Sequence, residues 1–363
     1  MKRLCVTLCK GEILPEKTHL DSLSLKYLQE LVIGLGMPKF RAMQIYKWIH
    51  HKNCEEISDM TDISVADRKK LSEVGVFTSL DVSDIRKSAK DGSVKFLFRL
   101  FDGELIEAVI LNDGKRFTAC ISSQVGCLMG CTFCATAKLG LKRNLTTGEI
   151  VKQVKRLNEY LADSEKKLNN LVFMGMGEPL DNLDNVKSAL TILLDDNGYG
   201  FSHRKITLST CGLTDKITEL FEMDTPVNLA VSVNSPDDEI RKEIMPVANK
   251  YPLSSLMDVL KKLPLTKRKS ITIEYVLLKG FNDSIEDAKK LVKMLKGLDK
   301  VKVNLITYNS GAEAGFSSPS EKETLKFQEY LISNNVGVFI RKSLGSDIEG
   351  ACGQLRAKHE DVS

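Results

Sequence analysis

The chain has 363 residues, of which 42% are hydrophobic and 28% are charged, and its formal net charge is +4. This composition is typical of a soluble protein with enough apolar side chains for a sizeable core, and the length suggests two or three domains. The small positive charge permits an anionic partner but does not require one. The nine cysteines are an odd number, and four of them lie within residues 120–134, which argues against a secreted disulfide framework.

The start of the chain is basic, but its apolar stretch, Leu4–Cys9, is only six residues long, which is too short for a secretion signal. No apolar run approaches the length of a membrane span. We therefore expect a cytoplasmic protein with no membrane partner. In a reducing compartment, closely spaced cysteines indicate metal binding or catalysis rather than disulfide bonds.

Residues 22–75 are predicted to be helical. Leucines recur there at helical spacing, and the Met37-Pro38 step interrupts the pattern. A second helix is expected over Phe40–Lys52, where apolar residues alternate with basic ones. Two interpretations of this region stay open: a small helical domain with a solvated basic rim, or a module that docks on RNA.

A β-hairpin is predicted for residues 93–111. Two apolar runs flank Asp102-Gly103, a dipeptide that favours a tight turn. Glu107 lies inside the second, otherwise apolar run. Either this strand exposes one face to solvent, or the Glu107 carboxylate points into a site.

From residue 117 onward, short apolar runs alternate with helical patterns, which predicts parallel strands joined by helical crossovers. The expected strands are Phe117–Ile121, Leu171–Met174, Lys205–Leu208, Val227–Val233, Ser270–Leu278 and Val301–Thr307. Helices are expected over Thr146–Leu161 and Ser284–Lys296, and another is expected to begin at Ser320. Six such units form a partial barrel, in which ligands gather at the carboxyl ends of the strands.

Three cysteines stand close together in Cys127-Leu-Met-Gly-Cys131-Thr-Phe-Cys134. Thiolates at this spacing can surround one soft metal centre from a single loop. Zinc normally needs a fourth protein ligand, and the nearest upstream thiol, Cys120, is seven residues away. A four-iron cluster with three protein thiolates keeps one iron open, which can hold the amino and carboxylate groups of S-adenosylmethionine. The spacing favours a [4Fe–4S] cluster, while zinc and unligated buried thiols stay open as alternatives.

Glycine-rich or polar residues follow several of the predicted strands. The glycines of Gly175-Met-Gly177-Glu178 let backbone atoms approach a ligand, and the carboxylate can accept a hydrogen bond from an ammonium group. Ser209, Ser232-Val233-Asn234 and Asn309 hold similar positions after later strands. Each segment can equally be a plain turn or a helix cap. Because the carboxyl ends of parallel strands meet at one edge, we expect these segments to lie close together.

The last cysteine, Cys352, lies between small residues in Gly-Ala-Cys-Gly. It is either a buried thiol that packs as a small hydrophobe or a thiol on a flexible segment that reaches a substrate. Cys120, just before the cysteine-rich loop, is its candidate partner. The two can form a transient disulfide if their Cα atoms come within about 7 Å.

These segments together resemble the RlmN/Cfr-type radical-SAM RNA methyltransferases, over nearly the whole chain. The most specific parts are Ser-Gln-Val-Gly-Cys127-Leu-Met-Gly-Cys131-Thr-Phe-Cys134-Ala-Thr, Gly-Met-Gly177-Glu178-Pro-Leu, and Asp347-Ile-Glu-Gly-Ala-Cys352-Gly-Gln-Leu. The resemblance implies an α/β fold, a partial (β/α)6 radical-SAM barrel with an N-terminal helical accessory domain and a β-hairpin extension. We accordingly expect an accessory RNA-binding domain over residues 1–90, the hairpin extension over 91–116, the barrel over 117–340, and a C-terminal segment carrying Cys352 over 341–363.

The resemblance also implies roles for individual residues. Cys127, Cys131 and Cys134 are expected to hold the [4Fe–4S] cluster. The positions expected around S-adenosylmethionine are Gly177, Glu178, Ser209, Ser232, Val233, Asn234 and Asn309. Cys352 matches a cysteine that is itself methylated, Cys120 matches the thiol that later resolves the adduct, and Glu107 matches an acidic catalytic position. The family usually has His at position 234 and often has Ser at position 211, so Asn234 and Cys211 depart from its pattern.

The implied enzyme uses two molecules of S-adenosylmethionine per turnover. C2 of adenine lies between two ring nitrogens and is electron-poor, so it does not attack a sulfonium methyl group, whereas the Cys352 thiolate does. A second S-adenosylmethionine, cleaved reductively, gives the radical that takes hydrogen from the methylated thioether, and the resulting carbon radical adds to C2. A Cys120–Cys352 disulfide then frees the methylated base, and either Cys120 or Glu107 takes the C2 proton.

The implied substrate is large-subunit ribosomal RNA, with transfer RNA as a further substrate in some members, and the target adenine must be unstacked. We expect a reductant such as flavodoxin or ferredoxin as electron donor and a monomeric enzyme. Two alternatives stay open. One is a Cfr-like enzyme that methylates C8 of the same adenine and confers antibiotic resistance, and the other is a non-catalytic iron–sulfur protein that binds RNA. The accessory N-terminal region favours C2.

Overall fold

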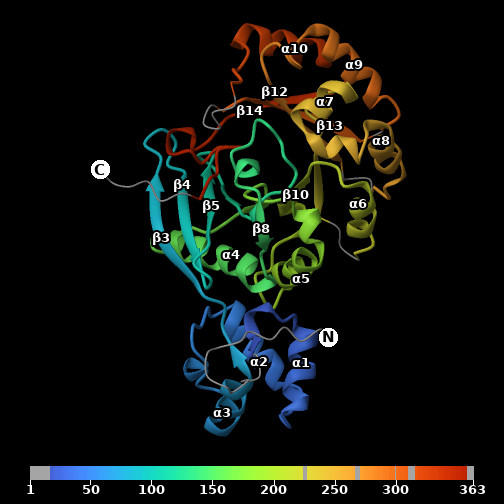
Figure 1. Cartoon of the computed structure of the whole chain (residues 1–363). Helices are drawn as coiled ribbons and strands as arrows, with labels where there is room; N and C mark the ends of the chain where they lie inside the picture. The colour runs from blue at the N-terminus through green and yellow to red at the C-terminus, as the bar shows by residue number, and fades with distance from the viewer. Residues whose placement is uncertain (1–16, 224–226, 266–269, 299, 310–314, 358–363) are drawn as a thin grey trace.

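The computed structural model describes residues 17–223, 227–265, 270–298, 300–309 and 315–357. A small group of helices near the N-terminus lies at one end of a larger region of mixed strands and helices (Figure 1). The first residues, on which the argument against a secretion signal rests, lie outside the described ranges. Within those ranges, no helix combines the length and the apolar character needed to cross a membrane.

The N-terminal region consists of three helices, α1 (Leu25–Gly34), α2 (Arg41–His50) and α3 (Val65–Val74). Two short parallel strands, β1 (Thr18–His19) and β2 (Gly75–Val76), join its beginning to its end. The residues buried between the helices include Leu28, Val32, Ile45, Ile49 and Leu71. The helical prediction for this part of the chain is confirmed.

A ten-stranded sheet organises the rest of the chain, in the order β14-β13-β12-β11-β10-β9-β6-β5-β4-β3. Seven neighbouring strands are parallel: β6 (Phe117–Cys120), β9 (Asn170–Phe173), β10 (Ile206–Thr210), β11 (Asn228–Ser232), β12 (Ile271–Leu277), β13 (Val301–Thr307) and β14 (Gly337–Arg341). Three antiparallel strands extend the sheet beyond β6: β3 (Leu80–Lys87), β4 (Val94–Leu100) and β5 (Leu105–Asn112). Because β14 and β3 are edges, the sheet is an open, partial barrel.

All six predicted parallel strands are present, but the sequence did not predict β3 or β14. Both are edge strands. Most residues of β3 are exposed or only partly buried, and β14 alternates between exposed and covered positions. An edge strand lacks the continuous apolar run that marks a strand covered on both faces, so neither segment stands out in the sequence.

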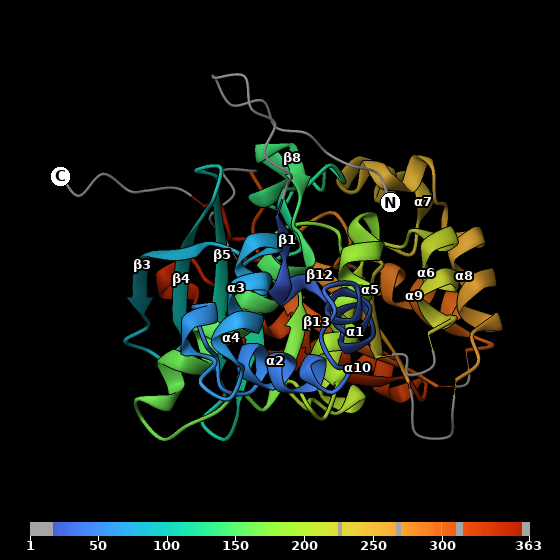
Figure 2. The same ribbon diagram turned by 90° about the horizontal axis from the view of Figure 1, so that it is seen from below.

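Helices connect the parallel strands and cover the outside of the sheet (Figures 1 and 2). They are α4 (Thr147–Ala162), α5 (Leu183–Leu194), α6 (Thr214–Phe221), α7 (Asp238–Ile244), α8 (Leu253–Lys262), α9 (Ile285–Leu295) and α10 (Glu321–Ser333). Capping boxes at Thr146, Ser284 and Ser320 begin α4, α9 and α10, the three helices whose starts the sequence predicts. These crossovers bring the carboxyl ends of the parallel strands to one edge of the sheet.

Two further short strands, β7 (Gln124–Gly126) and β8 (Leu141–Asn144), pair in antiparallel fashion on either side of the cysteine-rich loop. Short 3-10 helices complete the connections: Leu20–Ser22, Ile57–Asp59, Thr136–Leu139, Pro179–Asn182, His203–Lys205, Pro246–Asn249 and Ser346–Ile348. The strand pair β7–β8 therefore fixes the two ends of the loop that carries Cys127, Cys131 and Cys134.

The predicted hairpin is β4–β5, and its turn includes Gly103 at a φ of +83°. The expectation that Glu107 lies on an exposed strand face is wrong, because the residue is only 3% exposed. Its carboxylate lies 3.0 Å from the Lys95 ammonium group and accepts a hydrogen bond from the Arg356 backbone N–H at 2.8 Å. The C-terminal tail thus covers a face that a solvated hairpin would expose.

His50, at the end of α2, is buried against α4. Its ring lies 4.6 Å from the ring of Tyr46 and 5.9 Å from that of Tyr199, measured between centroids. Its Nε2 atom has no hydrogen-bond partner among the described residues. Burial, helped by the charge of Lys155, lowers the pKa of His50 to about 3. The imidazole is therefore neutral in the folded protein.

We expect the free energy of unfolding to fall as the pH drops below 6.5, the ordinary pKa of histidine, because only the unfolded chain then binds the His50 proton. The loss from this residue is about 1.4 kcal/mol per pH unit. His50→Phe keeps an aromatic ring between the two tyrosines and removes the titration, so its stability should depend less steeply on pH. Urea unfolding of both proteins between about pH 7 and pH 5 measures the two slopes, and equal slopes would refute the assignment.

Candidate active site

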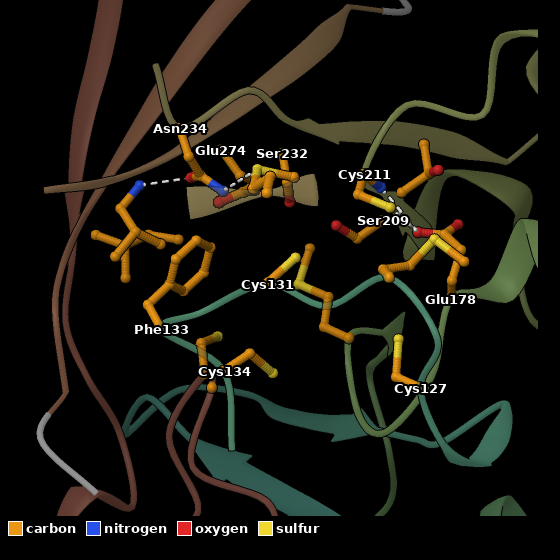
Figure 3. Close-up of a pocket in the computed structure, with 18 of the residues that line it drawn as sticks. Cys127, Cys131, Phe133, Cys134, Glu178, Ser209, Cys211, Ser232, Asn234 and Glu274 are labelled. Carbon is orange, nitrogen blue, oxygen red and sulfur yellow. Dashed lines mark hydrogen bonds between the residues drawn. The ribbon is translucent and has the colours of Figure 1, made fainter. Parts of the chain in front are cut away.

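An open cavity of about 960 Å³ lies at the carboxyl ends of the parallel strands. The cysteine-rich loop forms one side of it, and the strand ends that carry Ser232 and Asn234 lie across from that loop (Figure 3). Ten residues singled out in the sequence line this cavity: Cys127, Cys131, Cys134, Gly177, Glu178, Ser209, Ser232, Asn234, Asn309 and Cys352. The strand ends therefore meet at one place, as the sequence predicts. Val233, Cys120 and Glu107 are not part of this lining.

Backbone hydrogen bonds hold the cysteine-rich loop in place. The Cys127 N–H donates to the Gly140 carbonyl at 2.9 Å, and the Thr132 N–H donates to the Ile244 carbonyl at 3.0 Å. Gly126 has a φ of +78°, and a Cβ atom built on it would lie 1.8 Å from the Gly140 oxygen. Only glycine fits at this close approach, so the sequence Val-Gly-Cys sets the entry into the loop.

Cys127 and Cys131, two of the thiols of this loop, lie in an environment that disfavours free thiolates. Burial and neighbouring negative groups raise the pKa of Cys127 to about 12 and hold that of Cys131 well above its usual value. A cationic metal centre would reverse this effect by stabilising the thiolates. A positive centre between them would therefore favour the charged form of Cys127 and Cys131.

The donor set fits a cluster better than a single zinc ion. Among the described residues, no three His, Cys, Asp or Glu side chains are arranged to hold one metal ion. A fourth thiol, Cys211, also lines the cavity, but its sulfur already donates a hydrogen bond to Glu178. Three soft donors from one loop, without a free fourth, suit an iron–sulfur cluster with one open iron.

Glu178 is a buried carboxylate in a fixed position. One oxygen, Oε1, accepts from the Leu180 N–H at 3.1 Å, and the other accepts from the Cys211 N–H at 2.8 Å and from its thiol at 3.0 Å. Burial raises the pKa of Glu178, and these hydrogen bonds oppose that rise. Gly177 before it has a φ of +98°, and a Cβ atom there would lie 2.6 Å from the Gln124 side chain. The sequence pointed to Glu178 but gave no role to Cys211, which the structure identifies as its hydrogen-bond donor.

Asn234, where the family usually has histidine, uses its side chain to join two strands. Its Oδ1 accepts from the Val276 N–H at 2.8 Å, and its Nδ2 lies 3.1 Å from the Met245 sulfur. The residue has a φ of +56°, a left-handed conformation that asparagine tolerates better than most residues. The neighbouring Val233 side chain is fully buried and away from the cavity. The Asn234 side chain therefore forms part of the cavity wall and links it to β12.

A buried arginine lies behind the cavity and was not found from the sequence. Arg241 is 0% exposed, and its guanidinium donates to the carbonyls of Val233 at 3.2 Å, Tyr251 at 2.8 Å and Cys211 at 2.8 Å. It thereby ties the segment after β10 to the segment after β11. Burial lowers its pKa, although arginine remains a cation in proteins. Nothing local distinguishes this residue from an ordinary charged position on a short helix.

The C-terminal tail is attached to the site on both sides of Cys352. On the N-terminal side, Asp347 accepts hydrogen bonds from the Ser88 hydroxyl at 2.7 Å and from the Ala89 N–H at 3.1 Å. On the C-terminal side, the Leu355 carbonyl accepts from the Thr136 hydroxyl at 2.8 Å. Hydrogen bonds therefore hold the tail to the connection between β3 and β4 and to the segment that follows the cysteine-rich loop.

Cys352 lies between two cavities. It lines the first one and also a second cavity of about 590 Å³, which Cys120 lines as well. Both thiols are free, Cys120 being buried and Cys352 exposed. Burial raises the pKa of both thiols, and the charge of Arg341 partly opposes this rise.

Glu274, on β12, was also missed by the sequence reading. It is 5% exposed, lines both cavities, and accepts a hydrogen bond from the Asn304 amide at 2.8 Å. Burial raises the pKa of Glu274. The signal that could have found it is an acidic residue inside the apolar run Ile-Thr-Ile-Glu-Tyr, as at Glu107.

Two family models match the chain, the radical SAM superfamily over residues 121–294 and the ribosomal RNA large subunit methyltransferase N-terminal domain over residues 18–76. A dual-specificity RNA methyltransferase RlmN from Geotalea uraniireducens is 45% identical and covers 94% of this chain and 98% of its own. The protein of that name from Anaeromyxobacter sp. is 43% identical and covers 94% and 91%. A crystal structure of a radical SAM methyltransferase from Sphaerobacter thermophilus, 36% identical, covers 94% of this chain and 100% of its own with a TM-score of 0.89.

These relatives carry the RlmN name and give no support to the C8-methylating alternative. The superfamily match includes the three clustered cysteines, and the N-terminal match coincides with the three-helix region. The superfamily implies a [4Fe–4S] cluster and S-adenosylmethionine, which agrees with the donor set of the loop. The fold, the site and the relatives lead to one conclusion: the chain belongs to the RlmN family of radical SAM RNA methyltransferases.

Proposed function

We propose that this enzyme methylates C2 of an unstacked adenine in RNA and that the methyl carbon passes through Cys352. The names of the relatives and of the N-terminal domain support large-subunit ribosomal RNA as one substrate, and we take transfer RNA to be the second. The observation that carries the proposal is the position of Cys352. Its thiol lines the cavity beside the cysteine-rich loop and also the cavity lined by Cys120.

The first cavity is the proposed site of the cluster and S-adenosylmethionine. Cys127, Cys131 and Cys134 would hold the cluster, which when bound supplies the electron that cleaves S-adenosylmethionine. Glu178 keeps lone pairs free to accept from the ammonium group of the cofactor. Small or polar side chains at Gly177, Ser209, Ser232 and Asn309 line the same space. Val233 would contribute through its main chain, because its side chain is buried elsewhere.

Cys352 is the proposed methyl acceptor in the first half of the reaction. Its thiolate attacks the methyl group of one S-adenosylmethionine, so that a carbon–sulfur bond forms on the protein as the sulfonium bond breaks. Tail hydrogen bonds on both sides of Cys352, at Asp347 and at Leu355, orient it between the cavities. The residue can therefore face the cofactor on one side and the RNA base on the other.

Cys120 is the proposed resolving thiol. A second S-adenosylmethionine provides the hydrogen-abstracting radical, after which the methyl carbon joins C2 of adenine. The radical adduct would return one electron to the cluster and lose its C2 proton. The Cys120 thiolate then attacks the Cys352 sulfur, the disulfide forms as the carbon–sulfur bond to the product breaks, and the released methylene carbon takes a proton to become the methyl group. Glu107 contacts Lys95 and the tail rather than either cavity, which supports Cys120 as the group that takes the C2 proton and Glu107 as the residue that positions the tail.

The N-terminal helices are the proposed RNA-docking module. The Lys52 ammonium group lies 3.6 Å from the centre of the Trp48 ring, and the Arg41 guanidinium lies 5.1 Å from that of Phe40. The Phe40 side chain is 60% exposed. Trp48 is only partly buried, and an exposed ring beside a cation, as at Phe40, can stack on an unpaired base while the cation attracts phosphate, which favours RNA docking over a merely solvated rim.

We expect Cys352→Ala to make no methylated RNA and Cys120→Ala to accumulate a covalent protein–RNA adduct. The first variant lacks the sulfur that carries the methyl group, and the second lacks the thiol that releases the product. Anaerobic reconstitution with iron, sulfide, reductant, S-adenosylmethionine and large-subunit ribosomal RNA, followed by denaturing gels and nucleoside mass spectrometry, measures both outcomes. The wild-type product should be 2-methyladenosine rather than the 8-methyl isomer.

A matched control is Cys54→Ala, which removes another buried thiol that lines neither cavity. It should methylate RNA as the wild type does. Full turnover by Cys352→Ala would overturn the proposed route. A wild-type protein that binds RNA but releases no 5′-deoxyadenosine would instead be the non-catalytic iron–sulfur protein.

Methylation of Cys352 in the absence of RNA should accelerate as the pH rises. Burial and the neighbouring Glu274 carboxylate raise the pKa of Cys352 above 9.0, its ordinary value, and only the thiolate attacks S-adenosylmethionine. Below that pKa the thiolate fraction grows about tenfold per pH unit, so the rate should show no plateau below about pH 8. Mass spectrometry of the peptide that contains Cys352, after timed quenching, measures this rate. A flat profile between about pH 7 and pH 8 would show that thiol ionisation does not limit the step.

A further inference from the structure

The N-terminal helices are joined to the barrel by a group of charges that the proposed reaction does not use. Glu55, in the segment that follows α2, contacts one face of α4. Its carboxylate lies 3.0 Å from the Lys152 ammonium group, 2.5 Å from that of Lys155 and 3.0 Å from the Arg156 guanidinium. The side chains of Lys152 and Lys155 are only 7% and 6% exposed. Three cations from neighbouring turns of one helix thus converge on a single carboxylate.

The same two lysines also hold the backbone of this junction. The Lys152 ammonium group donates to the Thr78 carbonyl at 2.6 Å, where the chain passes from β2 to β3, and Lys155 donates to the Cys54 carbonyl at 3.3 Å. The approach is closer still at Gly148 of α4, because a Cβ atom built there would lie 2.1 Å from the Thr78 hydroxyl oxygen. Helix α4 therefore packs directly on the segment that leads from the N-terminal helices into the sheet.

Charge makes this contact specific. Burial raises the pKa of Glu55, but hydrogen bonds from Lys155 and Lys152 outweigh that effect and lower the pKa to about 2. The carboxylate is therefore ionised at neutral pH. Among the described residues, Glu55 is the one ion-pair partner of Lys152. Without the carboxylate, a nearly buried ammonium group would lack its counter-charge, which destabilises this arrangement of the two parts.

The N-terminal end of α4 is attached to the other side of the molecule. Glu149, in its first turn, accepts hydrogen bonds from both terminal nitrogens of Arg143 on β8, at 2.9 Å and 2.8 Å. The Arg143 Nε donates in turn to Asp102 in the turn of the β4–β5 hairpin at 2.6 Å. Because β8 holds one end of the cysteine-rich loop, α4 connects that loop to the N-terminal helices below it (Figure 1). One helix thus sets the distance between them.

We propose that Glu55, through Lys152, Lys155 and Arg156 of α4, fixes the N-terminal helices at one distance and orientation from the first cavity, and that this fixed position delivers RNA held by those helices to Cys352. The inference rests on the proposed function, because it takes the helices to be the RNA-docking module. Two contacts with one RNA molecule reinforce each other only when the protein holds both contact surfaces at a matching separation. Glu55 touches neither cavity, so it is a positioning residue.

The test compares two variants that remove one negative charge from adjacent positions. Glu55→Gln keeps the size of the side chain but loses the charge that pairs with α4. With a fragment of large-subunit ribosomal RNA that contains the target adenine, its kcat/KM should fall about tenfold, chiefly through a higher KM. Methylation of Cys352 by S-adenosylmethionine without RNA should keep the wild-type rate, because that step does not need the N-terminal helices.

Glu56→Gln is the matched control. The Glu56 carboxylate is exposed and accepts from the Ser58 hydroxyl at 2.9 Å, and no contact between it and α4 is present in the described part of the chain. This variant changes the net charge by the same amount as Glu55→Gln. It should therefore show the wild-type KM for RNA, and any general effect of charge on RNA attraction would appear in both variants.

A double-mutant cycle shows whether Glu55 acts through α4. The fold-loss in kcat/KM of Glu55→Gln combined with Lys152→Gln should be smaller than the product of the two single losses, because each change removes the same pair. Hydrogen exchange gives a structural readout: amides of residues 77–80 should exchange faster in Glu55→Gln, while those of β10–β13 keep their protection. Retained protection of these strands establishes that the barrel is folded.

The outcomes separate this inference from the function on which it rests. If the wild-type enzyme methylates RNA and Glu55→Gln behaves as Glu56→Gln does, the junction does not position the RNA and the inference is wrong. It is equally wrong if Glu55→Gln slows RNA-free methylation of Cys352 as much as RNA methylation, since the residue then supports the whole fold. If the wild-type enzyme methylates no RNA, the proposed function itself fails.

Discussion

The arrangement of this site depends on hydrogen bonds between the C-terminal tail and the segment that follows the three clustered cysteines. The Ala135 N–H donates to the Gly353 carbonyl at 2.8 Å, and the Thr136 hydroxyl donates to the Leu355 carbonyl at 2.8 Å, across a sequence separation of 219 residues. These bonds lie on the C-terminal side of Cys352. They place one thiol at the boundary of two cavities, and each step proposed for the enzyme uses that boundary. Without them, the first cavity would lack the part of its lining that Cys352 and Gly353 supply, and the proposed methyl acceptor would have no fixed position.

Much of the architecture could be predicted because it follows from local sequence patterns. Capping boxes at Thr146 and Ser320 begin helices in the structure, and six apolar runs are parallel strands. The spacing of the cysteines places three thiols on one loop whatever surrounds it. Because the carboxyl ends of parallel strands lie at one edge of a sheet, the sequence predicts that Glu178 and Asn309 lie close together. Both line one cavity, although they are far apart in the chain.

The rest could not be predicted because it depends on contacts between distant segments. Glu107 reads as solvent-exposed until the tail covers its strand and the Arg356 N–H donates to it. The Cys211 thiol can donate a hydrogen bond only because the turn after β9 brings the Glu178 carboxylate to 3.0 Å from its sulfur. Arg241 looks like a surface charge, yet it is buried with three carbonyl acceptors. In each case the hydrogen-bond partner lies too far along the chain for a local sequence pattern to reveal it. Burial of such a polar group is stable only when that partner is present.

The attachment of the tail has a consequence for how the enzyme is made. Synthesis proceeds from the N-terminus, and the helices and parallel strands can begin to fold before the last residues exist. Cys352 and the anchoring carbonyls of Gly353 and Leu355 follow the residues of the other elements that line the cavity, so they are translated after them. On the proposed route, a nascent chain therefore cannot transfer a methyl group to RNA before the segment that carries Cys352 has been translated.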